Sequence, residues 1–146
     1  MADVKKEPDT GRSRTDLAHS VQQFFEQFGR ALTAGDGTAI AGMWDTPAFV
    51  LADEGARTIA STDEIATFFD GVRAQYESRG IIDTRADLLW EEWLTERIVM
   101  VEVRWPYLDA AGHELGEELS TYTLRLDDSG ALRVRIVVTH GVSQPH

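Results

Sequence analysis

The spacing of apolar residues changes at Gly80, and this change restricts the chain to folds in which helices precede strands. Before Gly80 the apolar residues recur every three or four positions, as in Leu17, Val21, Phe24, Phe25, Phe28, Leu32 and again in Ile65, Phe68, Phe69, Val72, Tyr76. This spacing places them on one face of an α-helix. After Gly80 they alternate with polar residues, which predicts strands at about 82–94, 98–107, 117–126 and 132–140. The expected fold class is α+β, with helices on one face of a curved antiparallel sheet.

Cap and turn residues mark the ends of these elements. Gly35 is expected to end the first helix, and Asp36 to cap a short second one. Ser61 and Glu64 have the spacing of a capping box for a helix over 65–76. Short turns predict antiparallel hairpins at 53–55, 94–97, 109–112 and 127–130, and all but the one at 94–97 contain Gly and Asp.

The length of 146 residues is that of one domain. Residues 1–14 contain little apolar surface, so we expect a disordered N-terminal arm there. The folded domain is predicted over 15–141, followed by a short C-terminal tail at 142–146. No apolar run is long enough to span a bilayer and no signal peptide is evident, which predicts a cytoplasmic protein without a membrane partner.

The composition argues against several classes of function. The formal net charge of −11 disfavours nucleic acid and anionic membranes as partners, because both need a basic surface. The chain has no cysteine, and its four histidines lack the spacing of a metal site. No glycine-rich nucleotide-binding pattern is present. We therefore expect neither a metal nor a cofactor.

One segment of the first helix carries a family resemblance: Phe24-Phe25-Glu26-Gln27-Phe28-Gly29-Arg30-Ala31-Leu32-Thr33-Ala34-Gly35-Asp36. Together with Met43-Trp44, the Asp53-Glu54-Gly55 hairpin, the capped helix and the later strands, it resembles the nuclear transport factor 2-like superfamily. The similarity is to its SnoaL-like (polyketide cyclase-like) and ketosteroid isomerase-like bacterial branches, over about residues 17–141. This resemblance implies a cone-shaped sheet around a long helix, a pocket at the open end, and dimers formed through the sheet.

The resemblance does not extend to the catalytic residues of ketosteroid isomerases. Alignment on the Ala-Gly-Asp turn places Phe28 at the position of their tyrosine and Ala52 at that of their aspartate base. A phenyl ring cannot donate a hydrogen bond and a methyl group cannot accept a proton. Asp53 is next to the base position, but it is expected to serve the hairpin turn.

A second candidate site follows from strand alternation. If the last three strands pair around their turns, Glu118 lies opposite Trp105 on one side and roughly opposite His140 on the other. All three side chains would then face the interior at one end of the sheet. Glu118 and His140 are the predicted catalytic pair, with Glu118 setting the tautomer of His140. The alternative is a solvated strand end, because a shift of one residue turns Glu118 outward.

The opposite face of the sheet is the predicted surface for a homodimer. Glu102 and Arg104 interrupt an apolar strand, and we interpret them as outward-facing residues in cross-strand pairs rather than as a buried dyad. The apolar residues Ile98, Met100 and Val137 are expected on the same outer face. Apolar residues among such charges suit an interface.

The expected function is binding of a small hydrophobic molecule in an apolar pocket. The predicted pocket residues are Phe28, Trp44, Tyr76, Trp105 and Tyr122. If the protein is an enzyme, isomerisation, cyclisation or dehydration by cofactor-free acid–base chemistry is expected. The alternative is a non-catalytic module that binds a ligand or another protein chain.

Overall fold

The computed structural model describes the backbone of residues 14–143 and the side chains of residues 20–140. Along the chain it contains α1 (Arg14–Ala34), α2 (Gly37–Ala41), β2 (Trp44–Ala52), β3 (Gly55–Ile59), α3 (Thr62–Asp70), α4 (Val72–Ser78), β4 (Asp83–Thr84), β5 (Asp87–Trp93), β6 (Ile98–Leu108), β7 (Glu114–Leu126) and β8 (Leu132–Ser143). The predicted arm lies outside the described residues except for Arg14, which begins α1. β8 reaches two residues into the predicted C-terminal tail, and residues 144–146 are outside the described range.

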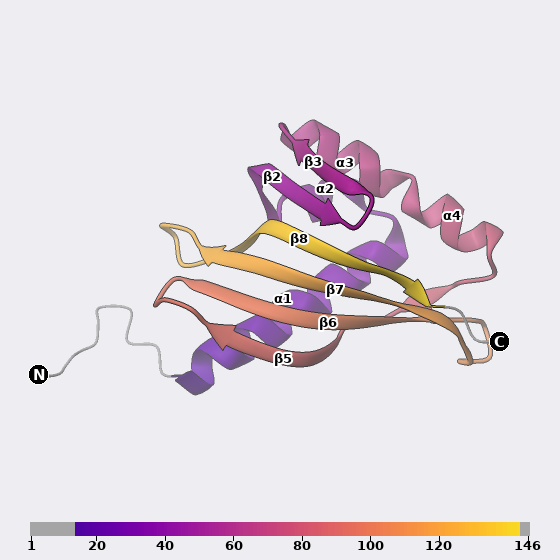
Figure 1. Cartoon of the computed structure of the whole chain (residues 1–146). Coiled ribbons are helices and arrows are strands. Elements are labelled where there is room, and N and C mark those ends of the chain that lie inside the picture. The colour runs from indigo at the N-terminus through magenta and orange to yellow at the C-terminus, as the bar shows by residue number, and fades with distance from the viewer. Residues whose placement is uncertain (1–13, 144–146) are drawn as a thin grey trace, which may run out of the picture.

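Helix α1 lies across one face of the curved sheet, while α3 lies on the side of β2 and β3 and α4 follows it toward one end of the strands (Figure 1). The face of α1 that the sequence predicts to be apolar is the buried one, since Val21, Phe25 and Phe28 are all buried. Gly35 ends the helix in the left-handed region, with a φ of 69° that favours glycine. Asp36 then caps α2, since its side chain accepts a hydrogen bond of 3.0 Å from the Ala39 N–H.

The predicted helix over 65–76 is two helices that meet at Gly71. The capping box is present, because Ser61 Oγ accepts a 3.2 Å hydrogen bond from the Glu64 N–H. Glu64 in turn accepts a bond of 2.7 Å from the Ala60 N–H. Gly71 is both the C-cap of α3 and the N-cap of α4. This break lets α4 extend over the end of the sheet that carries the candidate site.

Within the described residues the sheet has seven strands in the order β3-β2-β8-β7-β6-β4, and β5 also pairs with β6. β2 and β8 are parallel, so the sheet is mixed, whereas the predicted hairpins are antiparallel. The single strand predicted over 82–94 is interrupted at residues 85–86, opposite Pro106. Proline has no N–H to donate to the ladder. At this point the Pro106 carbonyl accepts a 2.9 Å hydrogen bond from the Thr84 hydroxyl.

The core between α1 and the sheet is rich in aromatic rings. The rings of Phe25 and Phe28 both contact Trp105 and Tyr122, at centroid distances between 5.1 and 6.3 Å. All four residues are buried. Burial of each large apolar side chain contributes about 1.5–3 kcal/mol, so these contacts hold α1 against β6 and β7.

An irregularity in β8 overturns part of the predicted facing of that strand. Val134 pairs with Leu124, but Ile136 pairs with Thr123, so Arg135 is an extra residue in β8. An extra residue reverses which face the following side chains occupy. Val137 is therefore buried opposite Tyr122 on the inner face, and its predicted place on the outer face is wrong.

Candidate functional site

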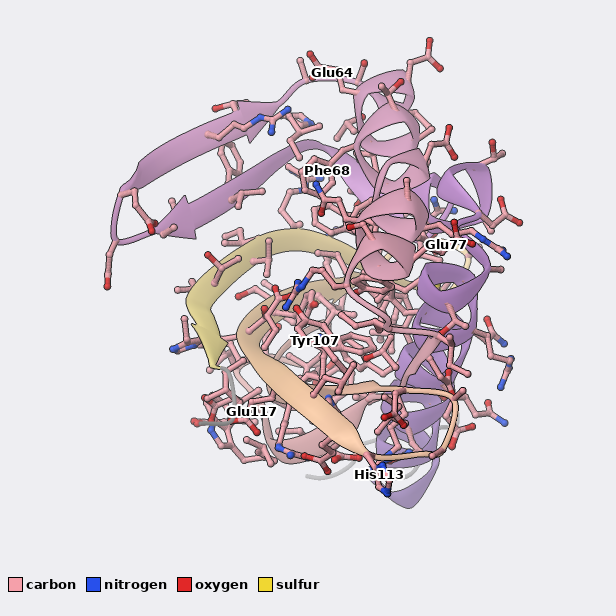
Figure 2. The ribbon with its side chains drawn as sticks, turned by 90° about the vertical axis from the view of Figure 1, so that its right-hand side faces the viewer. Glu64, Phe68, Glu77, Tyr107, His113 and Glu117 are labelled. Atoms are coloured by element: carbon pink, nitrogen blue, oxygen red, sulfur yellow. The ribbon has the colours of Figure 1, made fainter. Side chains whose placement is uncertain are left out.

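The candidate site is a half-buried carboxylate on the inner face of β7. We define the Glu118 cluster as Tyr76 of α4, Tyr107 of β6, and Glu118 and Ser120 of β7. The Tyr107 hydroxyl donates to Glu118 Oε1 at 2.8 Å, and the Ser120 hydroxyl donates to Glu118 Oε2 at 3.3 Å. Figure 2 shows Tyr107 inside the curve of the strands. The carboxylate is thus held between neighbouring strands.

The charge of Glu118 is not neutralised by a nearby base. Within the described part of the chain, no arginine or histidine nitrogen forms an ion pair with this carboxylate. Each of its oxygens accepts one described hydrogen bond, which leaves a lone pair on each for a further donor. Glu118 is therefore available to a ligand or a proton.

Two phenols of the cluster are maintained in their protonated form. Burial raises the pKa of Tyr76 and of Tyr107, and the nearby charge of Glu118 raises both further. Their rings are in contact, with centroids 5.6 Å apart. The Tyr76 hydroxyl makes no hydrogen bond with any residue that the structure describes, so this donor remains available near Tyr107.

Deeper on the same face, Trp105 and Tyr122 form a hydrogen-bonded pair. The indole Nε1–H of Trp105 donates to the Tyr122 hydroxyl at 3.0 Å, and the two residues are only 3% and 6% exposed. Burial raises the pKa of Tyr122, and the charge of Glu118 adds to that shift. The predicted facing of Trp105, Glu118 and Tyr122 toward the interior agrees with the structure, and Trp105 pairs with Glu118 across the ladder.

The structure does not bring Glu118 and His140 together. The extra residue at Arg135 turns His140 to the outer face, and Glu118 pairs with Val142 instead. His140 Nε2 lies 2.8 Å from the Thr121 hydroxyl and 4.0 Å from Glu102 Oε2. The predicted contact between Glu118 and His140 is therefore wrong, because the β8 bulge breaks the alternation from which it was derived.

Two further predicted pocket residues belong to the aromatic core. Phe28 is 1% exposed and contacts Trp44 at a centroid distance of 6.4 Å. Trp44 is 5% exposed, and its ring also contacts Phe69 at 5.7 Å. Both rings therefore support the interior of the fold, while Tyr76 contacts Tyr107 nearer to Glu118.

Sequence reasoning did not name Tyr107, Ser120 or Arg79 as site residues. Strand alternation places Ser120 on the inner face with Glu118, and it would have placed Tyr107, two residues after Trp105, there as well. No periodic pattern in the sequence pointed to Arg79 as a site residue. It follows α4, and its guanidinium carbon lies 5.1 Å from the centre of the Tyr107 ring.

The outer face of the sheet carries two rows of side chains across five strands. Residues that pair in turn form one row of Phe49, Ile136, Thr123, Met100 and Glu92, and another of Leu51, Val138, Thr121, Glu102 and Trp90. Phe49, Leu51 and Trp90 are 38%, 40% and 43% exposed. The outward facing predicted for Glu102 is correct, and its carboxylate accepts a 2.6 Å hydrogen bond from Trp90 Nε1.

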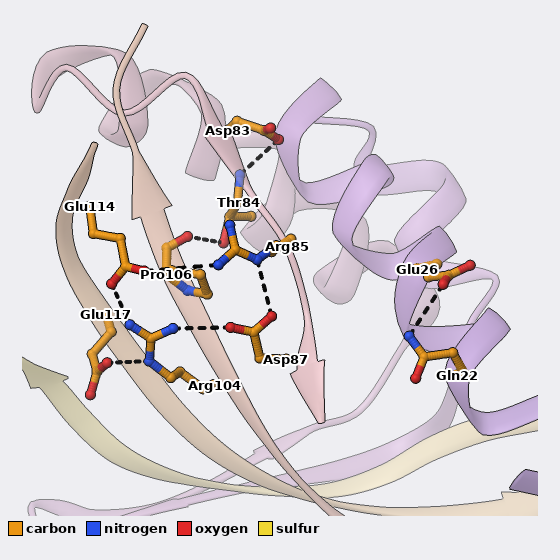
Figure 3. A network of polar contacts seen from close by, with 10 residues as sticks. All are labelled: Gln22, Glu26, Asp83, Thr84, Arg85, Asp87, Arg104, Pro106, Glu114 and Glu117. Atoms are coloured by element: carbon orange, nitrogen blue, oxygen red, sulfur yellow. Dashed lines mark hydrogen bonds and ion pairs between the residues drawn. The ribbon is translucent and has the colours of Figure 1, made fainter. Parts of the chain in front are cut away.

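Arg104 also faces outward, where it is the centre of an ion-pair network (Figure 3). Its guanidinium contacts Asp87 of β5 and two residues of β7, Glu114 and Glu117. The hydrogen bond that it donates to Glu117 is the main cause of the raised pKa of Arg104. The network joins three adjacent strands and therefore supports their register.

A separate open groove lies beside α1, with a volume of about 790 Å³. Its walls include Glu26 and Arg30 of α1 together with the segment 82–86. None of the predicted pocket residues lines it. Among the described residues there is no group of three His, Asp or Glu side chains placed to hold a metal ion, and no helix long and apolar enough to cross a membrane.

Comparison with solved structures identifies the fold. A protein with a cystatin-like fold from Nostoc punctiforme is 16% identical, with a TM-score of 0.69 over 88% of this chain and 78% of that one. Aln2 from a Streptomyces species is 18% identical, with a TM-score of 0.67 over 88% and 92% of the two chains. A ketosteroid isomerase-like protein from Erwinia carotovora atroseptica is 13% identical, with a TM-score of 0.64 over 88% and 97%.

Comparison with curated proteins gave no match. The family model described as NTF2-like protein (DUF6841) matches residues 16–142, a range that extends from the first turn of α1 to the end of β8. These residues include the helix, the bent sheet and the whole Glu118 cluster. The agreement of this match with the α+β architecture shows that the chain belongs to the NTF2-like family DUF6841.

Proposed function

We propose that this domain binds a small, largely apolar organic molecule at the Glu118 cluster and transfers a proton within it without a cofactor. The observation that carries the proposal is the position of Glu118 between Tyr107 and Ser120, with Tyr76 against the Tyr107 ring and its hydroxyl not bonded to any described residue. A proton acceptor and a hydrogen-bond donor beside each other are the two groups that proton transfer next to a carbonyl requires.

The proposed step begins with a ligand whose carbonyl oxygen accepts a hydrogen bond from the Tyr76 hydroxyl. Glu118 removes a proton from the neighbouring carbon, and the electron pair of that C–H bond moves to form an enolate. The phenol stabilises the negative oxygen, and Glu118 then returns the proton to the same or another carbon. The raised pKa of Tyr76 supports this role, because the phenol stays protonated and remains a donor.

A shared fold is in keeping with this class of reaction. The chain shares its fold with a ketosteroid isomerase-like protein, and the resemblance of the first helix points to the same branch. The carboxylate is carried by β7 rather than by the first hairpin, where Ala52 stands at the expected base position. Glu118 thus supplies a carboxylate from a different strand.

Binding is tested with 2-naphthol, a neutral bicyclic molecule with one hydroxyl donor, followed by nuclear magnetic resonance of isotope-labelled protein. We expect the signals of Tyr76, Tyr107 and Ser120 to shift together, and Glu118→Gln to weaken binding. Glu96→Gln is the control, because Glu96 is an exposed glutamate in the turn before β6. The binding proposal fails if the signals of the cluster do not move.

Catalysis is tested with 2-tetralone in deuterium oxide, where uptake of deuterium next to the carbonyl is measured by mass spectrometry. A general base contributes roughly 10²–10⁴-fold, so Glu118→Gln is expected to slow exchange by at least about 100-fold relative to Glu96→Gln. Equal exchange rates in the two variants would contradict the role of Glu118. Binding without any enzyme-dependent exchange would instead support the non-catalytic alternative.

A second proposal concerns the outer face, where a homodimer is supported by the two rows defined above. The apolar side chains there include Phe49, Leu51, Met100, Ile136 and Val138, from three strands. Exposed apolar residues gathered on one face are typical of protein interfaces. A stable dimer would bury at least about 1,200 Å² across this surface.

Sedimentation velocity at micromolar concentration tests the dimer. We expect a dimer for the unmodified chain and a monomer for Met100→Glu, because a buried unpaired carboxylate opposes association. Ile82→Glu is the matched control, since Ile82 is 57% exposed but lies before β4, outside the two rows. A monomer for the unmodified chain would refute the proposal.

A further inference from the structure

Arg79 is positioned by the end of α4 and by the face of Tyr107. It is the C-cap residue of α4, and its backbone N–H donates to the Tyr76 carbonyl at 3.0 Å. Its guanidinium carbon lies 5.1 Å from the centre of the Tyr107 ring, within the range of a cation–π contact. Arg79 therefore places a positive charge against the Tyr107 ring of the Glu118 cluster.

This charge has no carboxylate partner in the described part of the chain. Six other arginines form ion pairs with Asp or Glu: Arg73, Arg85, Arg97, Arg104, Arg133 and Arg135. Arg79 forms none of these pairs, although the chain carries a net charge of −11. Its side chain is exposed, so a guanidinium with five donors is accessible from solvent.

The cluster consequently has a positive end and a negative end. Tyr107 contacts both, because its ring faces Arg79 and its hydroxyl bonds to Glu118. Glu118 raises the pKa of Tyr76 and of Tyr107, whereas Arg79 lowers both. Each phenol therefore lies in the field of both charges. A ligand that spans the two ends meets a cation first and a carboxylate further in.

We propose that Arg79 is a specificity-determining residue that selects organic ligands with an acidic group at one end and a hydrogen-bond donor at the other. The inference rests on the proposed function, because it assumes that the ligand lies against Tyr107. A carboxylate on the ligand pairs with the guanidinium in a bidentate arrangement, while the donor faces Glu118. Because Arg79 is exposed and its field is screened, the preference for an acidic ligand over a neutral one is roughly three- to tenfold.

The test uses two probes of the same shape, 6-hydroxy-2-naphthoate and 6-hydroxy-2-naphthamide. The first carries a carboxylate where the second carries a neutral amide, and both carry the hydroxyl donor. Dissociation constants are measured by nuclear magnetic resonance titration, followed at Tyr76 and Tyr107. For the unmodified chain we expect the naphthoate to bind roughly three- to tenfold more tightly than the naphthamide.

Two variants assign this preference to Arg79. Arg79→Gln is expected to bring the ratio of the two dissociation constants close to one, and Arg79→Lys to retain part of it. Arg57→Gln is the control, because Arg57 also lies over an aromatic ring, Phe68, at 5.7 Å, but belongs to β3. It removes the same charge from the chain and is expected to keep the original ratio.

The outcomes separate this inference from the proposed function. Equal affinity for both probes in the unmodified chain, or an unchanged ratio in Arg79→Gln, overturns the role of Arg79 and leaves binding at the Glu118 cluster intact. An equal loss of preference in Arg57→Gln also overturns it, since net charge alone would then explain the result. If neither probe shifts the cluster signals, the proposed function fails and this inference fails with it.

Discussion

Replacement of Tyr122 by phenylalanine removes one buried hydroxyl, which interacts with Trp105 and with Ser120 in the interior of the sheet. The substitution removes only the hydroxyl that accepts from Trp105 Nε1 at 3.0 Å, and it keeps the ring contacts with Phe25 and Phe28. Trp105 is 3% exposed, so water does not replace the lost acceptor. The indole N–H is left buried without its partner.

The expected loss follows from that desolvation. A buried donor without an acceptor costs about 1–3 kcal/mol, and we expect about 1.5 kcal/mol here because a buried hydroxyl is removed at the same time. For a domain of this length that loss lowers the melting temperature by roughly 5 °C.

The assay is urea unfolding followed by tryptophan fluorescence, supported by thermal unfolding. Tyr76→Phe is the matched control, because the Tyr76 hydroxyl makes no hydrogen bond with a described residue, and its free energy of unfolding should change by less than about 0.5 kcal/mol. A change for Tyr122→Phe as small as that of the control would show that the Trp105–Tyr122 bond does not stabilise the fold.

Three further substitutions test the structure elsewhere. Arg104→Met should lower the free energy of unfolding by about 1–2 kcal/mol in low salt and by less in high salt, because it removes three partly exposed ion pairs; urea titrations at two salt concentrations check this. Gly37→Ala should cost about 2–4 kcal/mol, because an added Cβ would overlap the Ala66 carbonyl and the Asp70 carboxylate, and thermal unfolding that matches the unmodified chain would refute it. Asp127→Asn should make the free energy of unfolding less sensitive to acidic pH. The Asp127 carboxylate accepts several hydrogen bonds, of which the one from the Ser129 hydroxyl has the largest effect. They lower the folded pKa of Asp127 below its unfolded value of about 3.9. Its contribution is therefore present above pH ~3.9 and lost as the pH falls through the folded pKa, so unfolding curves of the two chains should converge in acid.

The helices, turns and caps of this protein were predictable because they depend on neighbours in sequence. Gly35 and Asp36 end one helix and start the next through backbone conformation and a bond to the third residue along. The inner faces of β6 and β7 were also predictable, since Val101, Trp105 and Tyr122 keep the two-residue period along unbroken stretches. Trp105 and Glu118 therefore pair as expected.

The candidate site was predicted only in part. Glu118 was identified, but its partner was assigned as His140 from an alternation that assumes a regular strand. The extra residue at Arg135 lies in a strand that joins β7 on one side and β2 on the other, and Val134 pairs with Trp44 just before it. Whether β8 bulges at this point depends on the strands beside it. The paired residues Trp44 and Val134 are 90 positions apart along the chain.

By itself the sequence determined the α+β class, the order of the elements and the inward placement of Glu118, because each of these follows from local hydrogen bonding and hydrophobic period. Only the tertiary structure decided which side chains surround that carboxylate. Tyr76 of α4 and Arg79, which directly follows α4, precede β7 by about 35 residues, and they reach Tyr107 because Gly71 separates α3 from α4. Contacts between elements so far apart depend on how helix and sheet pack together, and no local pattern encodes that packing.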